Sequence, residues 1–137
     1  MSALRAFWVF TALPVWGIIM LFTSVMKDNK RFLRCFRKGR YCADKFIVCY
    51  YYPNEGAENE LGLSVSKKIG NAVTRNRFKR ICRAAYRLKE QELPIGYDMV
   101  FVARQGVQEK SSADIEEFIV NKLAPSINRS FNKKAKK

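Results

Sequence analysis

Histidine is absent from this sequence, and acidic residues are scarce: 12 aspartates and glutamates stand against 26 lysines and arginines. Without histidine, the usual general base for a serine or cysteine nucleophile is missing. The four cysteines never form a C-x-x-C pair, so they lack the ligand spacing of a zinc site. They are Cys35, Cys42, Cys49 and Cys82. We therefore expect no catalytic side chain and no protein-held metal, with adjacent carboxylates such as Glu116 and Glu117 as the formal exception.

The charge that is present is strongly positive. A formal net charge of +14 on 137 residues attracts polyanions, which makes nucleic acid or an anionic membrane the natural partner. Apolar residues make up 48% of the chain, more than a disordered basic tail carries, so the charge decorates a folded core. We expect one compact domain in the cytoplasm, where the cysteines stay reduced and pack as free thiols.

The first residues differ in character from the rest. Residues 6–22 form an uncharged run of 17, similar to a signal peptide or a short membrane anchor. Pro14 and Gly17 weaken a helix there, and no small-x-small cleavage site follows. We favour the alternative that the true start lies at Met20 or Met26. A membrane becomes a partner only if this run is retained as an anchor.

Composition divides the chain into three segments. Residues 1–25 are expected to form a hydrophobic extension, and residues 26–124 the folded domain. Residues 125–137 read as a basic tail whose apolar content is too low to fold. The functional residues are therefore expected in the middle segment.

Hydrophobic periodicity predicts three helices and three strands, in the order α-β-β-α-β-α. Helices are expected at residues 28–38, 71–90 and from 111 onward, and strands at 46–52, 61–66 and 98–103. The second strand alternates apolar and small residues, which suggests a half-buried hairpin partner of the first. In the longest helix Asn71 can cap the start. Its core-facing residues are expected to be Phe78, Ile81, Ala85 and Leu88.

The longest predicted helix carries an unusual load of charge. Seven basic residues and no acidic one lie between Thr74 and Lys89. Four of them recur at steps of four and form a basic ridge, comprising Arg75, Lys79, Arg83 and Arg87. Like charges at this spacing repel one another, whereas an ordinary solvated helix face mixes signs. The ridge therefore indicates contact with phosphates.

Aromatic residues near the start of the domain allow two interpretations. Phe32, Phe36 and Tyr50 could stack on unpaired bases, as in readers of single-stranded RNA. They could equally belong to the core.

The run LGLSVSKKIGNAVTRNRFKRICRAAYR, residues 61–87, resembles the signature of the bacterial ribonuclease P protein family. The family's RNR motif stands here at residues 75–77. The similarity continues upstream through Phe32, Phe36 and Gly39, and downstream through GYDMVFVAR at residues 96–104.

This resemblance implies a fold and a division of labour. The implied fold is α+β, a single α-β sandwich of αβββαβα order with a left-handed β-α-β crossover, and the additional short strand would lie near residues 41–43. The implied enzyme is ribonuclease P, an endoribonuclease that removes the 5′ leader of precursor tRNA. Its RNA subunit hydrolyses the phosphodiester with Mg²⁺ held mainly by that RNA, and no protein partner is required.

The resemblance also implies roles for particular residues. Contacts to the catalytic RNA are expected from Lys67, Lys68, Arg75, Asn76, Arg77, Lys79, Arg80 and Arg83. The wall of the cleft that holds the unpaired leader is expected from Phe32, Phe36, Val48 and Tyr50.

Three other functions stay open at this point. A structural RNA-binding protein of ribosomal type would use the same basic helix without substrate turnover. A membrane-anchored protein would lay its basic domain on anionic lipid, and depends wholly on residues 6–22. A helix-turn-helix DNA reader would need a helix directly before residue 71, where the pattern predicts a strand.

Overall fold

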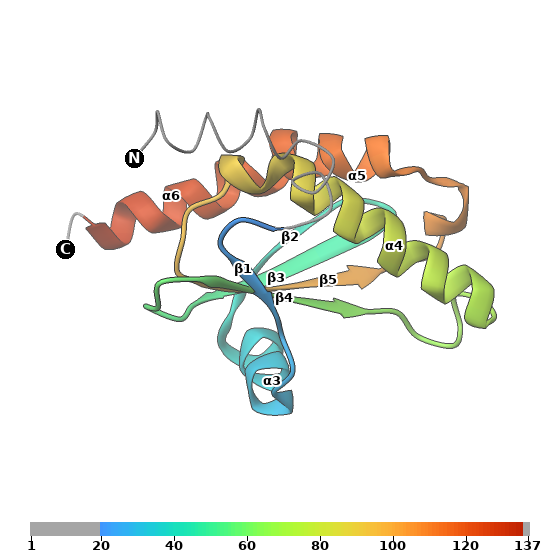
Figure 1. The fold of residues 1–137 in the computed structure, drawn as a ribbon, viewed down its shortest axis with the longest axis horizontal. Helices are drawn as coiled ribbons and strands as arrows, with labels where there is room; N and C mark the ends of the chain where they lie inside the picture. The colour runs from blue at the N-terminus through green and yellow to red at the C-terminus, as the bar shows by residue number, and fades with distance from the viewer. Residues whose placement is uncertain (1–19, 136–137) are drawn as a thin grey trace.

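The computed structural model describes residues 20–135, in which a five-stranded sheet lies between two layers of helices. The strands are β1 (Thr23–Val25), β2 (Arg40–Ala43), β3 (Ile47–Pro53), β4 (Asn59–Ser64) and β5 (Tyr97–Ala103). The helices are α3 (Asn29–Lys38), α4 (Ala72–Lys89), α5 (Ser112–Phe118) and α6 (Ala124–Ala135), and a π-helical turn (Ile119–Leu123) joins the last two. Figure 1 shows α3 on one face of the sheet and α4, α5 and α6 on the other.

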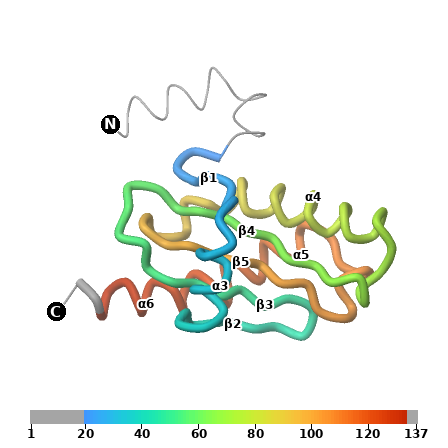
Figure 2. The backbone as a smooth tube through the Cα atoms, turned by 90° about the horizontal axis from the view of Figure 1, so that it is seen from below, coloured from blue at the N-terminus to red at the C-terminus, as the bar shows by residue number. Residues whose placement is uncertain are grey.

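The strand order is β1-β4-β5-β3-β2. β4 pairs in parallel with β1 and β5, while β3 pairs antiparallel with β5 and β2. The connection from β4 through α4 to β5 is left-handed. When the sheet is viewed from the α4 side with β4 and β5 pointing up, β5 lies to the left of β4, as Figures 1 and 2 together show. Such crossovers are right-handed in nearly all other sheets. The predicted α+β class, the crossover and the short strand near residues 41–43 are confirmed.

The predicted hairpin between residues 46–52 and 61–66 is wrong. β5 lies between β3 and β4, so these two strands are consecutive in sequence but not adjacent in the sheet. The alternation of apolar and small residues in β4 indicates which face of the strand is buried. It does not indicate which strand pairs with β4. The crossover through α4 decides the pairing instead.

The main core lies between the sheet and the three-helix layer. Phe101 is its centre, since its ring meets Tyr86 edge-to-face at 6.2 Å and Phe118 at 6.4 Å between centroids. Edge-to-face contacts add to the stabilisation from burial. A smaller core of Met26, Cys35 and Val100 lies beneath α3 on the opposite face.

Helix α4 begins as predicted, because the Asn71 side chain accepts a hydrogen bond from the Thr74 amide at 3.0 Å. Its apolar face is rotated from the predicted one. Phe78 and Ala85 are buried, but Leu88 is 56% exposed. Cys82 and Tyr86 take the buried positions, because the helix packs along the i, i+4, i+8 row that starts at Phe78.

The folded part begins before the predicted boundary at residue 26. β1 pairs with β4, and the Leu21 and Phe22 amides donate to the Glu90 carboxylate at 2.7 and 3.0 Å. The Thr23 hydroxyl also donates to Glu90 and lies 2.8 Å from the Tyr86 hydroxyl. Composition could not reveal this, because the attachment is made by main-chain groups to a carboxylate that is distant in sequence.

The prediction that residues 125–137 do not fold is also wrong, because α6 covers Ala124–Ala135. Ile127 is fully buried, and the Ser126 hydroxyl lies 2.7 Å from the Tyr51 hydroxyl. The Asn128 amide donates to the Glu92 carbonyl at 3.3 Å. One buried apolar side chain and two hydrogen bonds dock this basic segment on the rest of the domain.

Most of the hydrophobic run at residues 6–22 lies outside the described residues. Within residues 20–135, no helix has the length and apolar character needed to cross a membrane.

The Glu90 contacts generate a stability prediction. Glu90→Ala leaves two main-chain amides without their acceptor, so the free energy of unfolding should fall by about 1–3 kcal/mol, measured by urea denaturation. The matched control is Glu92→Ala, whose exposed side chain lies in the same short 3-10 helix (Glu90–Glu92). Glu92→Ala should change the free energy of unfolding by less than about 0.5 kcal/mol. Equal losses in both variants would contradict the proposed attachment of β1.

Candidate nucleic-acid interface

The basic ridge of α4 has little intramolecular compensation. The ion pairs found between residues 20 and 135 hold Arg31, Arg34 and Lys122. Arg75, Lys79 and Arg83 of the ridge have no carboxylate partner in this part of the chain. The ridge is thus a concentrated positive surface that external anions can neutralise.

The residues predicted to contact RNA lie on the ridge and around it. Asn76 and Arg80 are exposed on α4, and Lys67 and Lys68 are exposed in the turn that precedes it. Arg75 is half-buried, and its Nε atom is buried without a hydrogen-bond partner among the described residues. The segment before this turn is strand β4, so the helix-turn-helix alternative is wrong for the described chain.

Arg77 has a different place from its neighbours. Its guanidinium donates to the Gln108 carbonyl at 3.3 Å and to the Lys110 carbonyl at 2.7 Å. The Gln108 amide in turn donates to the Ile69 carbonyl at 2.6 Å. Arg77 therefore fixes the loop after β5 against the start of α4, a role the sequence pattern did not predict.

A second surface lies on the α3 side of the sheet. The Phe36 ring meets Tyr50 edge-to-face at 5.1 Å between centroids, and Tyr41 lies 5.9 Å from Tyr50. Phe36 is 40% exposed and Tyr41 is 66% exposed, so their rings are available to a ligand. We call these three residues the aromatic surface. Tyr41 was missed because only the strand register, in which it stands opposite Tyr50, brings it there.

Two of the four residues predicted for the cleft wall are mainly packing residues. Phe32 is half-buried and lies against Gly62, where an added Cβ would come within 2.6 Å of the ring. Val48 is 9% exposed and lies on the same side of β3 as Tyr50. The structure brings Phe36 and Tyr50 into ring contact, whereas Phe32 packs against Gly62 of β4 and Val48 is buried in β3.

A buried carboxylate holds α3 in position. Asp98 is fully buried and accepts from Arg31 at 3.1 Å, Arg34 at 2.8 Å and Asn54 at 2.8 Å. Arg31 also pairs with Glu60 at 2.7 Å. Arg31 and Arg34 are therefore neutralised, unlike Arg75, Lys79 and Arg83 of α4 in the described chain. Sequence reasoning missed this cluster because its members are distant along the chain.

The thiols of Cys35, Cys49 and Cys82 are packed in the interior of the described chain rather than activated. Among residues 20–135, no group of three or more Cys, Asp or Glu side chains could hold a metal ion. Burial raises the pKa of the Cys35 thiol to about 12, and burial likewise raises the pKa of Cys49 and Cys82. These thiols are protonated near neutral pH and are poor nucleophiles. All four cysteines are free, as predicted.

The contrast between Arg77 and Arg80 can be tested. Arg77→Ala removes two hydrogen bonds from a charged donor, so the free energy of unfolding should fall by about 1–2 kcal/mol in urea denaturation. Arg80→Ala, one turn along the same helix, should change it by less than about 0.5 kcal/mol. If both variants are as stable as the parent protein, Arg77 does not hold the loop.

Comparison with known proteins agrees with this geometry. The family model described as Ribonuclease P matches residues 22–125. A ribonuclease P protein component of Clostridium botulinum (strain Loch Maree / Type A3) is 40% identical over 99 residues, covering 72% of this chain and 89% of the relative. That of Caldanaerobacter subterraneus subsp. tengcongensis is 44% identical over 94 residues, covering 69% and 81%.

Solved structures agree as well. The RNase P protein of Staphylococcus aureus has a TM-score of 0.62 at 34% identity, covering 68% of this chain and 85% of that structure. The Thermotoga maritima protein has a TM-score of 0.65 at 25% identity, covering 72% and 93%. Sequence, fold and family model point to one assignment: the chain belongs to the ribonuclease P protein family.

Proposed function

We propose that this protein works as the RNA-binding subunit of a ribonucleoprotein that removes the 5′ leader of precursor tRNA. The observation that carries the proposal is the basic ridge of α4, whose residues Arg75, Lys79 and Arg83 lack carboxylate partners among the described residues. A catalytic RNA supplies the phosphates that such a surface attracts. Family membership supports the identity of that RNA as ribonuclease P RNA.

In this proposal α4 is the side that faces the catalytic RNA. Asn76 and Arg80 are exposed beside the ridge, and Lys67 and Lys68 extend the positive surface at its start. Their chemistry is charge and hydrogen bonding to phosphate oxygens, which positions the protein on the RNA without proton transfer. Arg77 supports this surface from within by fixing the adjoining loop.

The aromatic surface is the side that receives the leader. Unpaired bases can stack on exposed rings, and each such stack contributes about 1–3 kcal/mol. Phe36 and Tyr41 offer exposed ring faces, while Tyr50 connects them through ring contacts. Paired bases in the tRNA body cannot stack in this way, so the surface favours precursors over mature tRNA.

Hydrolysis itself belongs to the RNA in this proposal. The buried thiols have raised pKa values, and the chain contains no histidine. Mg²⁺ would be held mainly by the catalytic RNA, and the protein would act in the cytoplasm on precursor tRNA without needing a second protein. The alternative, a ribosomal-type RNA-binding protein, shares α4 but predicts no preference for leader-bearing substrates.

The leader assignment predicts a change in substrate preference. Phe36→Ala should weaken binding of the holoenzyme to precursor tRNA by about 1–3 kcal/mol and leave binding of mature tRNA nearly unchanged. Filter binding with both RNAs gives the ratio of the dissociation constants for mature and precursor tRNA. Phe32→Ala is the companion variant, and it should mainly lower the free energy of unfolding because its ring packs on Gly62. A folded Phe36→Ala protein with an unchanged ratio would rule out this aromatic surface.

The basic surface of α4 predicts a different effect. Arg80→Ala and Arg83→Ala should each weaken binding of the protein to the catalytic RNA, and should each reduce the slope of log K against log[salt] by about one. Arg129→Ala, an exposed cation on α6, is the control and should leave the slope unchanged. A parent slope near zero, or equal effects from Arg129→Ala, would contradict the electrostatic account.

A further inference from the structure

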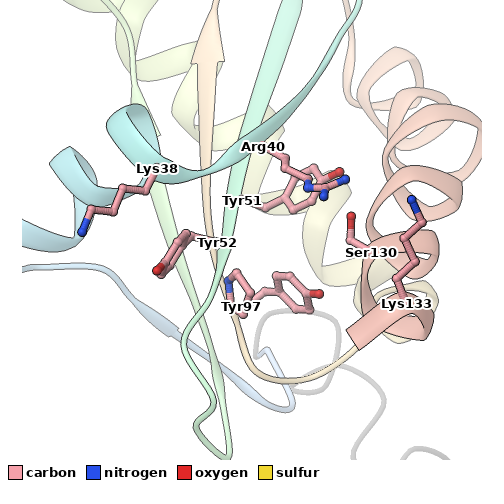
Figure 3. A pocket seen from close by; sticks show the side chains of 8 residues that line it. Lys38, Arg40, Tyr51, Tyr52, Tyr97, Ser130 and Lys133 are labelled. Carbon is pink, nitrogen blue, oxygen red and sulfur yellow. The ribbon is translucent and has the colours of Figure 1, made fainter. Parts of the chain in front are cut away.

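A basic pocket of about 310 Å³ lies at the free edge of the sheet, away from the α4 ridge. Six of its lining residues matter here, namely Lys38, Arg40, Tyr51, Tyr97, Ser130 and Lys133. They come from the end of α3, from β2, β3 and β5, and from α6. In Figure 3, Arg40, Ser130 and Lys133 face a common space, and Lys38 lies on the α3 side.

Helix α6 completes this pocket. Ile127 anchors α6 in the core, and the hydrogen bond between the Tyr51 and Ser126 hydroxyls fixes the helix to β3. Ser130 and Lys133 follow one and two turns after Ser126 and so lie on the same side of α6. They also lie beyond residue 125, where the match to the family model ends. The pocket is thus built partly by a segment outside the matched region.

The pocket is positively charged without internal compensation. Among its described lining residues three are cationic and none is acidic. None of these three cations takes part in the ion pairs found in residues 20–135. A guanidinium, an ammonium and a hydroxyl facing one space suit a phosphate group, because each donates hydrogen bonds and the first two carry charge.

We propose that this pocket binds a backbone phosphate of the precursor's 5′ leader, upstream of the nucleotides that lie on the aromatic surface. The inference rests on the proposed function for its ligand. Tyr41 and Arg40 are consecutive on β2, so they point to opposite faces of the sheet. Because β2 is an outer strand, an RNA strand leaving Tyr41 can turn over this edge and meet Arg40. Lys38, two residues after Phe36, lies along the same path.

The test uses the full-length protein assembled with a bacterial ribonuclease P RNA. Its substrates are precursor tRNAs whose leaders are shortened one nucleotide at a time from the 5′ end. With the parent protein, the affinity of the holoenzyme for the precursor should drop at the leader length that no longer reaches the pocket. The double variant Arg40→Ala with Lys133→Ala should lack this drop, and should bind long-leader precursors at least about threefold more weakly.

The control is Arg129→Ala, which removes a cation from α6 that does not line the pocket. It should retain the drop in affinity. Binding of the double variant to the shortest leaders and to the catalytic RNA should equal that of the parent. Uniform weakening at every leader length, weakened binding of the catalytic RNA, or no change at all would each overturn the proposal. Phe36→Ala measured on the shortest leaders tests the aromatic surface separately, so the two failures can be distinguished.

Discussion

The packing of one apolar face of α4 against the sheet fixes both the position of the basic ridge and the order of the strands. Phe78, Cys82 and Tyr86 are buried there, and burial of a large apolar side chain contributes about 1.5–3 kcal/mol. Each like-charged pair along the ridge costs only about 0.2–0.5 kcal/mol. Packing therefore exceeds repulsion, and the helix can present concentrated positive charge. The same helix forms the crossover that places β5 between β4 and β3 and so builds the face on which the aromatic surface lies.

The two sides of the sheet differ in whether carboxylates neutralise their arginines and lysines. On the α3 side, Arg31 and Arg34 pair with Glu60 and Asp98, and the rings of Phe36 and Tyr41 are exposed. On the α4 side, Arg75, Lys79 and Arg83 have no such carboxylate partners among residues 20–135. A surface of rings suits bases, and a surface of unpaired cations suits phosphates. One small domain can therefore hold two parts of an RNA assembly without contributing a catalytic group.

Sequence patterns predicted the features that depend on local chemistry. The cap at Asn71, the helices α3, α4 and α5 and the strands β3, β4 and β5 follow from periodicity and end signals, and the RNR signature led to the left-handed crossover. Long-range features were missed. Main-chain attachment of β1 to Glu90, the Asp98 cluster and the pairing of Tyr41 with Tyr50 depend on tertiary contacts that no local pattern contains. The basic tail folds as α6 because Ile127 packs in the core. The average composition of the segment does not reveal this contact.

Reconstituted cleavage distinguishes a protein that assists a catalytic RNA from one that cuts RNA itself. The purified protein, a bacterial ribonuclease P RNA and Mg²⁺ are combined separately and together with precursor tRNA, and the 5′ ends of the products are mapped. We expect that the protein alone leaves the precursor intact, and that adding it to the RNA increases cleavage at the mature 5′ end when Mg²⁺ is limiting. Metal-dependent cleavage by the RNA-free protein, or RNA-catalysed cleavage that the protein does not stimulate, would contradict this expectation.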